Sequence, residues 1–232
     1  MLRNDTLGPR NLTLTPELHT YLLAQGRMTP DPVLAELIEH TRAAVPDQAH
    51  MTVAPEEGAL LTFLVRLLGA RHIVEVGTFT GYSSLCLARG LPADGSLITC
   101  DVSAEWTALA HDFWARDGVA DRIELRLGPA LDTLRALPAE PHLDLAFIDA
   151  DKPGYIGYWE ELVPRLRPGA LLLADNTLFS GQVIDADPGE KPAAIRAFNE
   201  HARKDDRVQL VMLPVADGLT MARRLPPGES PV

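Results

Sequence analysis

Positive charge, cysteine and long apolar runs are scarce in this chain of 232 residues. The 21 Lys and Arg residues are outnumbered by 32 Asp and Glu, and the net charge of −11 repels phosphate backbones. We therefore expect no nucleic-acid partner. Arg66 interrupts the apolar stretch at residues 59–70, which leaves no run long enough to span a membrane. Arg3 and Asp5 break up the N-terminus, so no signal-peptide core forms, and we expect a soluble cytoplasmic protein without a membrane partner.

The sequence offers no soft-metal site. Its two cysteines, Cys86 and Cys100, form no CxxC pair and lie inside a predicted helix and a predicted strand, so we interpret them as buried reduced thiols. The seven histidines are scattered, with no HExxH motif and no His/Cys cluster. A zinc site is therefore not expected.

Helical and strand patterns alternate along most of the chain. Strand patterns occupy residues 72–76, 96–101, 122–127, 143–149, 170–174, 208–213 and 219–224. Helical patterns occupy residues 15–26, 55–68, 82–89, 104–116, 130–137, 155–166 and 192–204, with another helix beginning at residue 31 and a long loop at residues 176–190. This alternation predicts an α/β, Rossmann-like fold: a mostly parallel seven-stranded sheet with helices on both faces. The last two strands are joined too closely for a crossover, so we expect an antiparallel C-terminal strand.

The chain has 46% hydrophobic residues, enough for one large core, and no stretch is typical of a linker. We divide it into an N-terminal helical segment at residues 1–50, a main domain at residues 51–225 and a proline-rich flexible tail at residues 226–232. The N-terminal segment has more apolar side chains than capping of a core requires, at Leu18, Leu22, Leu23, Val33, Leu34, Leu37 and Ile38. We therefore predict a homodimer in which this segment forms the dimer contact and a substrate cap.

Three short polar segments follow predicted buried strands: Glu75-Val-Gly-Thr-Phe-Thr-Gly81, Asp149-Ala-Asp-Lys152 and Asp175-Asn176. In an open parallel sheet, ligands lie beyond the carboxyl ends of the strands, so all three segments should face one crevice. Two carboxylates and an amide oxygen are hard ligands, which suit Mg²⁺, Ca²⁺ or Mn²⁺. The arrangement favours group transfer to a metal-bound substrate.

The first segment is a small-residue loop that opens a helix, as in nucleoside sites. It departs from the dinucleotide fingerprint GxGxxG, because Phe79 stands where the middle glycine would contact a pyrophosphate. Glu75 would repel a pyrophosphate and can accept a hydrogen bond from an ammonium group. Asp101 ends the next strand, where a carboxylate can bind both hydroxyls of a ribose. A cationic, phosphate-free nucleoside with an amino-acid tail fits this loop, which points to S-adenosylmethionine.

The chain resembles the cation-dependent O-methyltransferases, the family of caffeoyl-CoA O-methyltransferase and, more distantly, catechol O-methyltransferase. The motifs that carry the resemblance are Met51-Thr-Val, Val74-Glu-Val-Gly, Gly81-Tyr-Ser-Ser, Gly128-Pro-Ala, Phe147-Ile-Asp-Ala-Asp-Lys-Pro-Gly-Tyr, Asp175-Asn-Thr-Leu-Phe-Ser-Gly and Leu213-Pro-Val-Ala-Asp-Gly-Leu. The resemblance implies a class I methyltransferase fold over residues 51–225, which transfers a methyl group from S-adenosylmethionine to a hydroxyl of a catechol-like aromatic small molecule.

The resemblance also implies roles for individual residues. The cofactor contacts would be Val53, Glu75, Gly77, Thr78, Ser83, Asp101, Ala130, Asp151 and Tyr158. The cation, Mg²⁺ for example, would be held by Asp149, Asp175 and Asn176, with Lys152 beside the substrate hydroxyl. Val53 stands where the plant enzymes have threonine, and Ser180 where they have asparagine near the substrate. We place Phe179 and Ser180 on the acceptor side, and the acceptor stays open among a free catechol, a caffeoyl-type thioester, a flavonoid and a natural-product intermediate.

The chemistry of methyl transfer accounts for these residue types. A neutral phenol, with a pKa near 10 by analogy with tyrosine, is a poor nucleophile, and a divalent cation chelated by neighbouring hydroxyls lowers that pKa. Lys152 can then take the proton, which makes Lys152 and Asp149 the predicted catalytic residues. Two alternatives are an NAD-dependent oxidoreductase, which Phe79 argues against, and a non-catalytic binding protein on the same fold. The second is disfavoured because the base and all three ligands are present.

Overall fold

The computed structural model describes residues 12–231 of the chain. The first eleven residues of the predicted N-terminal segment, including Arg3 and Asp5, lie outside the described residues, as does Val232 of the predicted tail. Seven strands form one sheet in the order β3-β2-β1-β4-β5-β7-β6. They are β1 (His72–Val76), β2 (Ser96–Asp101), β3 (Ile123–Leu127), β4 (Leu143–Ile148), β5 (Leu166–Ala174), β6 (Val208–Leu213) and β7 (Leu219–Arg224).

The sheet is mostly parallel. Strands β3, β2, β1, β4 and β5 pair in parallel, whereas β7 is antiparallel to both of its neighbours, β5 and β6. The predicted α/β fold, with a mostly parallel seven-stranded sheet and an antiparallel C-terminal strand, is confirmed. Strands β1 and β4 are neighbours in the sheet although they are far apart in the sequence. The strand order changes direction between them, and the predicted crevice would lie beyond their carboxyl ends.

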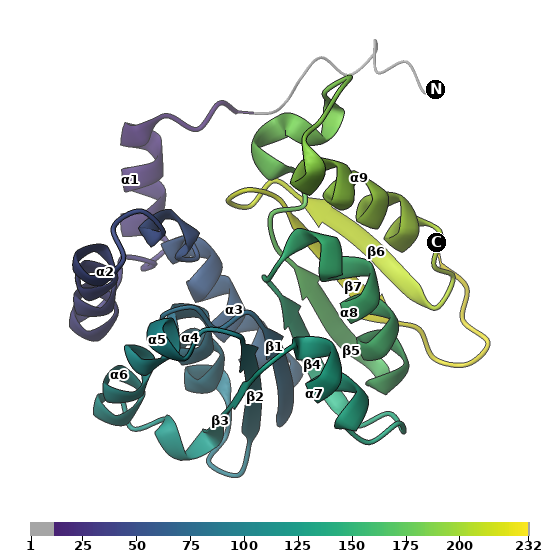
Figure 1. Ribbon diagram of the computed structural model, residues 1–232, viewed down its shortest axis with the longest axis horizontal. Helices are drawn as coiled ribbons and strands as arrows, with labels where there is room; N and C mark the ends of the chain where they lie inside the picture. Colours follow the sequence, from purple (N-terminus) through teal and green to yellow (C-terminus); the bar gives the residue numbers. More distant parts are fainter. Residues whose placement is uncertain (1–11, 232) are drawn as a thin grey trace.

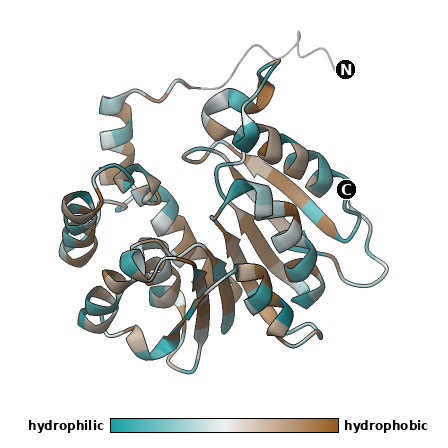
Figure 2. Ribbon diagram, viewed as in Figure 1, coloured by the Kyte–Doolittle hydropathy of each residue, from teal (hydrophilic) through white to brown (hydrophobic). Residues whose placement is uncertain are grey.

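Helices cover both faces of this sheet (Figure 1). They are α1 (Pro16–Gln25), α2 (Pro32–Ala44), α3 (Pro55–Leu68), α4 (Tyr82–Gly90), α5 (Ala104–Ala108), α6 (Ala110–Arg116), α7 (Ala130–Ala136), α8 (Tyr155–Leu162) and α9 (Glu190–Arg203). Helices α2, α3, α4 and α6 pack on one face in a core that includes Ile73 and Phe147, and α7, α8 and α9 pack on the other with Val74 and Ile148. Figure 2 shows the hydrophobic strands between these two layers, with hydrophilic residues on the outer sides of the helices.

Alternation along the strands sorts the side chains between the two cores. In β1, Ile73 belongs to the first core, whereas Val74 and Val76 belong to the second. Cys86 and Cys100 are both buried and unpaired, which confirms them as buried thiols, and burial raises the pKa of Cys86 to about 12 and of Cys100 to about 11. No helix within residues 12–231 is both long and apolar enough to cross a membrane.

Two predicted helices are shorter than the sequence suggested. The helix predicted at residues 104–116 is divided at Leu109 into α5 and α6. The Leu109 N–H donates to the Trp106 carbonyl, 3.2 Å away, three residues back instead of the four of an α-helix. The helix predicted to reach residue 166 ends at Leu162, because Pro164 has no N–H to continue the ladder. Strand β5 consequently starts at Leu166, four residues before the predicted start, and the loop predicted at residues 176–190 contains a 3₁₀ helix at Phe179–Ile184.

The N-terminal helices differ in how they attach to the body. Helix α2 contributes Leu34 and Leu37 to the first core, and Val33 and Ile38 pack against it. Helix α1 has no buried residue and lies at the edge of the molecule (Figure 1). A 3.0 Å contact between His19 Nε2 and Glu56 Oε1 joins it to α3. Of the predicted apolar side chains of α1, Leu18 and Leu23 are half-buried and Leu22 is exposed.

Candidate active site

The three predicted polar segments meet because backbone pairing continues past the strand ends. The Gly77 N–H donates to the Cys100 carbonyl over 2.9 Å, and the Asp149 N–H donates to the Val76 carbonyl over 2.8 Å. The Asp175 N–H donates to the carbonyl of Ile148, the last residue of β4, over 3.0 Å. The residues that follow β1, β4 and β5 are thus aligned side by side at one edge of the sheet.

Glycine is required where the first loop passes β4. Gly77 has φ 104°, and a Cβ there would lie 1.9 Å from the carbonyl oxygen of Asp149. Gly81, with φ 86°, precedes α4, and its Cβ would lie 2.5 Å from the Cβ of Ala110. The two glycines therefore let the loop turn between β4 and α6 without a steric clash.

Asp101, predicted to bind a ribose, also shapes the loop. Its Oδ2 accepts hydrogen bonds from the backbone N–H of Thr78, at 3.0 Å, and of Phe79, at 2.7 Å. Its Oδ1 accepts from the Ser103 N–H at 2.8 Å. Phe79 adopts a left-handed φ of 49°, and its ring packs edge-on against Trp106 with centroids 5.4 Å apart. A carboxylate oxygen has two lone pairs, so acceptor capacity remains for hydroxyl groups, and the ribose role stays a prediction.

Glu75 is completely buried next to the loop. Its Oε2 accepts hydrogen bonds from the hydroxyls of Ser84 and Thr99, whereas Oε1 has no partner within the described residues. Burial raises the pKa of Glu75 to about 7, against the opposing effect of the serine and threonine hydroxyls. An unpartnered buried acceptor suits an incoming ammonium donor.

The other predicted cofactor residues come from the segments that follow β1, β3 and β4 and from the segment that precedes α3. Val53, Thr78, Ser83 and Ala130 are buried, as is Tyr158, and Asp151 is exposed. The Tyr158 hydroxyl donates to Asp151, and the hydroxyls of Thr78 and Thr99 lie 2.6 Å apart. Ser83 is in the first turn of α4 and Ala130 begins α7, both just beyond strand ends.

Lys152 lies among the predicted metal ligands. Its Nζ donates to Asn176 Oδ1 at 2.6 Å, to the Tyr155 hydroxyl at 2.7 Å and to Asp149 Oδ1 at 3.1 Å. The same nitrogen lies 4.8 Å from the centroid of the Tyr155 ring. The oxygens of Asp149 and Asn176 therefore converge on a point where a positive charge is bound.

Asn176 is held in a strained backbone conformation. Its φ of 55° is left-handed, a region that asparagine tolerates better than most residues. Its amide nitrogen donates to Asp175 Oδ2 at 3.1 Å, which leaves its Oδ1 directed at Lys152. Such strain is typical of functional sites, where the surrounding structure fixes the side chain.

The two carboxyl groups at this edge differ in burial: the Asp149 side chain is partly exposed and Asp175 is buried. Asp175 is only 3% exposed, and burial, followed by the charge of Asp149, raises its pKa. Within residues 12–231, no three His, Cys, Asp or Glu side chains are arranged to hold a metal ion together. The predicted ligand set is not of that composition, because it consists of the two carboxylates of Asp149 and Asp175 and the amide oxygen of Asn176. Hard oxygen donors with excess negative charge fit a divalent cation.

Sequence reasoning missed Glu57. This side chain is fully buried in the first turn of α3, and burial, followed by the charges of Asp175 and Asp149, raises its pKa. Glu57 precedes the buried Leu61 by four residues, so helical periodicity already assigned it to the buried face of α3. That periodicity was the available signal, since an acidic residue in a first helical turn is otherwise unremarkable.

The predicted acceptor residues lie on the loop after Asn176. Phe179 and Ser180 have φ values of 45° and 51°, and Ser180 is exposed. The loop is tied to the β6–β7 turn, because Leu178 N donates to the Asp217 carbonyl at 3.0 Å and Ser180 N to the Asp217 carboxylate. The turn at Asp217 and Gly218 therefore fixes the path of the loop that contains Phe179 and Ser180.

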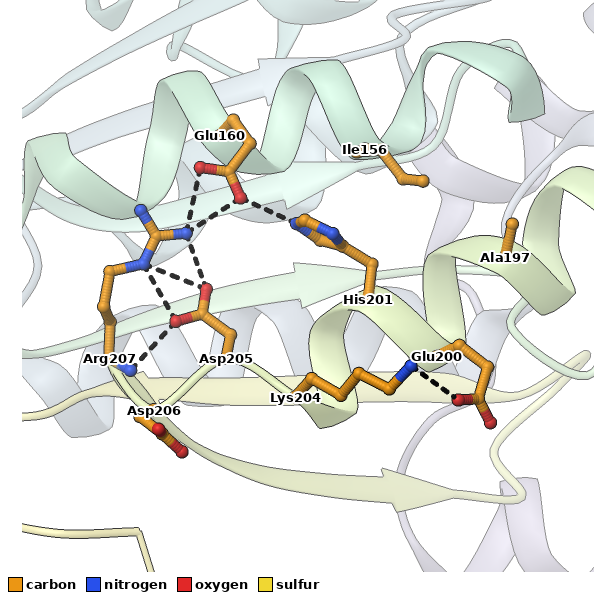
Figure 3. A pocket seen from close by; sticks show the side chains of 9 residues that line it. All are labelled: Ile156, Glu160, Ala197, Glu200, His201, Lys204, Asp205, Asp206 and Arg207. Carbon is orange, nitrogen blue, oxygen red and sulfur yellow. Dashed lines mark hydrogen bonds and ion pairs between the residues drawn. The ribbon is translucent and has the colours of Figure 1, made fainter.

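A separate surface hollow between α8 and α9 holds a charged network (Figure 3). Glu160 contacts both His201 Nε2, at 2.6 Å, and Arg207, which also pairs with Asp205. Asp205 accepts from Trp159 Nε1 at 2.8 Å. Burial favours a higher pKa for Asp205, but hydrogen bonds from Arg207 and Trp159 outweigh this effect and lower the pKa to about 2. These charges compensate one another, so we interpret the network as structural.

Comparisons with known proteins agree with the fold. The family model described as O-methyltransferase matches residues 27–225. Caffeoyl-CoA O-methyltransferase 2 from Zea mays is 36% identical over 96% of this chain and 88% of its own. Among solved structures, the O-methyltransferase TomG from Streptomyces achromogenes, in complex with SAM, has a TM-score of 0.82 and 32% identity over 90% of this chain and 96% of that one. An O-methyltransferase from Bacillus cereus, in complex with SAH, has a TM-score of 0.81 and 33% identity, covering 90% and 97%.

The parallel sheet, the glycine loop and the polar strand ends define a Rossmann-like transferase. This chain belongs to the O-methyltransferase family, as the match over most of its length shows.

The close approach of Gly77 to β4 can be tested by Gly77→Ala. A positive φ alone costs about 1–3 kcal/mol for a residue with a side chain, and here the added Cβ also collides with Asp149. Gly169→Ala is the matched control, because its φ is 87° but no atom lies within 4 Å of the added Cβ. We expect urea unfolding to give a clearly larger loss of stability for Gly77→Ala. Equal losses would contradict the steric argument.

Proposed function

We propose that this protein is a divalent-cation-dependent O-methyltransferase that transfers a methyl group from S-adenosylmethionine to one hydroxyl of a catechol-like aromatic small molecule. The observation that carries the proposal is the convergence of Asp149 and Asn176 oxygens on one cationic group beside the glycine loop. Membership of the O-methyltransferase family and the SAM-bound state of the Streptomyces achromogenes relative support it. Both favour methyl transfer over nicotinamide chemistry or mere binding.

S-adenosylmethionine supplies an electrophilic methyl group on a sulfonium centre. The unpartnered Oε1 of Glu75 would bind its ammonium group, and Asp101 its ribose hydroxyls. Gly77 and Thr78 would let the backbone approach the cofactor closely. Contacts from Val53, Ser83, Ala130, Asp151 and Tyr158 would complete the cofactor site.

Asp149, Asp175 and Asn176 would hold the cation, Mg²⁺ or alternatively Ca²⁺ or Mn²⁺. When bound, such a cation supplies positive charge that lowers the pKa of an acceptor hydroxyl and fixes its orientation. The buried, like-charged carboxylates support this assignment, because they lack a compensating charge other than Lys152 among their described contacts.

Lys152 would accept the proton of the acceptor hydroxyl. Tyr155 and Asn176 hold its Nζ by hydrogen bonds of 2.7 and 2.6 Å, which orients the amine and keeps it next to the ligands. Phe179 and Ser180 would line the acceptor side. The acceptor class is a small aromatic with neighbouring hydroxyls, whether a free catechol, a caffeoyl-type thioester, a flavonoid or a natural-product intermediate.

Chelation tests the cation. We expect excess EDTA to abolish turnover of a catechol acceptor and Mg²⁺ to restore it, with Asp149→Ala and Asp175→Ala almost inactive. Cofactor binding, measured by calorimetry, should survive chelation, because Glu75 and Asp101 are separate from the cation ligands. Full activity in excess EDTA would contradict the proposed cation dependence.

Lys152→Ala tests the base. Positioned general bases contribute about 10²–10⁴-fold, so kcat should fall by that order while the cofactor Kd changes little. The deficit should shrink as pH rises, since the acceptor hydroxyl then ionises unaided. Lys152→Arg should not rescue, because a guanidinium stays protonated at these pH values. A wild-type rate for Lys152→Ala at neutral pH would show that Lys152 is not the base and that its charge has only a structural role.

We also propose a cytoplasmic homodimer in which the helical segment at residues 1–50 forms the contact and caps the substrate. The exposed apolar side chains of α1, Tyr21 and Leu22 among them, support it. Leu22→Asp should shift the protein towards monomer in light scattering, whereas the exposed Gln25→Asp on the same helix should not. An unchanged dimer in Leu22→Asp, or a monomeric wild type, contradicts this contact.

A further inference from the structure

A buried hydrogen bond joins the N-terminal segment to the glycine loop at residues 77–81. The Thr41 hydroxyl of α2 donates to the Thr80 hydroxyl over 2.8 Å, and the two residues are 1% and 0% exposed. A helical threonine commonly donates its single proton to a carbonyl of the preceding turn, whereas Thr41 donates to another segment of the chain. Because a buried hydroxyl that loses its partner is costly, this contact ties α2 to one residue of the loop.

Helix α2 is anchored on the body of the protein, which fixes the place of Thr41. At its N-terminus, Asp31 pairs with Arg89 of α4 over 2.6 Å. One turn before Thr41, Leu37 is completely buried in the first core. The Thr41 hydroxyl therefore reaches the loop from a defined position.

The loop is strained at Phe79 and is held on both sides of it. Phe79 has a left-handed φ of 49°, which a residue with a bulky side chain keeps only where its surroundings fix it. From the sheet, Asp101 accepts hydrogen bonds from the N–H groups of Thr78 and Phe79. From α2, Thr41 holds Thr80. Loss of the second contact would let Phe79 relax towards an unstrained conformation.

We propose that Thr41 is a positioning residue for S-adenosylmethionine, whose hydroxyl holds Thr80, and through it the glycine loop, in the conformation that binds the cofactor. When Phe79 relaxes, its N–H group turns away from Asp101, and the carboxylate proposed to bind the ribose loses its orientation. The segment proposed as a substrate cap thus also sets the affinity for the cofactor. This inference rests on the proposed function, because it takes the loop as part of the cofactor site.

Calorimetry of S-adenosylmethionine binding tests the proposal without turnover. Thr41→Val removes the donor at almost unchanged volume and should weaken binding about 2–10-fold, which corresponds to the net contribution of one hydrogen bond. The loss should be partial, because Trp114 Nε1 also holds the loop through the Gly81 carbonyl at 3.1 Å. Thr41→Ser keeps the hydroxyl and should bind as the wild type does. Unchanged affinity in Thr41→Val overturns the proposal, and so does an equal loss in Thr41→Ser.

Thr62→Val is the matched control for a general loss of stability. The Thr62 hydroxyl donates to the Cys86 carbonyl at 2.7 Å, so it joins α3 to α4 and does not hold the loop. Urea unfolding should show lower stability for Thr62→Val and Thr41→Val alike, whereas only Thr41→Val should bind the cofactor more weakly. Equal losses of affinity in the two variants would overturn the proposal, because weaker packing would then explain both.

The double variant Thr41→Val/Thr80→Val carries the test if Thr41→Val does not fold. It removes both hydroxyls, so neither is left buried without its partner, and such paired apolar replacements cost little stability. Because it removes the same contact, it should show the same loss of cofactor affinity as Thr41→Val. Wild-type affinity in the double variant would overturn the proposal.

Asp101→Ala distinguishes this inference from the proposed function. If Asp101→Ala does not bind S-adenosylmethionine while Thr41→Val binds it as the wild type does, the role of Thr41 is wrong and the cofactor site stands. If the wild type does not bind S-adenosylmethionine, the proposed function falls, and the role of Thr41 falls with it.

Discussion

The active-site edge depends on backbone hydrogen bonds that continue the sheet one residue past its strands. The N–H groups of Gly77, Asp149 and Asp175 each bond a carbonyl of the neighbouring strand, so three segments from distant parts of the sequence are held in register by main chain alone. Backbone pairing of this kind leaves the side chains free to point into the crevice. The same pairing explains why residue 77 is a glycine, because the paired backbones leave no room for a Cβ between the loop and Asp149.

Acidic groups are concentrated where this chain can least solvate them. Glu57 and Glu75 are fully buried, Asp175 nearly so, and burial raises the pKa of each. Two apolar cores, one on each face of the sheet, supply the stability that such groups cost. Acidic groups kept in fixed, poorly solvated places lower the stability of the fold, as groups retained for function commonly do.

Sequence patterns predicted the features that depend on residues close together in the sequence. Strand–helix alternation gave the architecture, and polar residues directly after apolar runs gave the edge where Asp149, Lys152 and Asn176 meet. The division at Leu109 could not be predicted, because it depends on the Leu109 N–H donating to the Trp106 carbonyl, three residues back, within a sequence whose pattern is helical throughout. Glu57 was missed for another reason: helical periodicity places it on the buried face of α3, but only the packing of the chain shows that neither of its carboxylate oxygens meets a donor within the described residues.

The tie between the acceptor loop and the β6–β7 turn has a consequence for evolution. Thr177, Leu178 and Ser180 are held through their backbone N–H groups, so the path of the loop does not depend on which side chains it displays. If Phe179 and Ser180 line the acceptor as proposed, exchanging either of them can change the acceptor preference while the proposed cation and cofactor residues stay in place. The left-handed φ values at both positions restrict which residue types can stand there, since β-branched residues are disfavoured and asparagine, aspartate and glycine are tolerated. Substitutions in this loop should therefore change the free energy of unfolding little, but only a few residue types are permitted at these two positions.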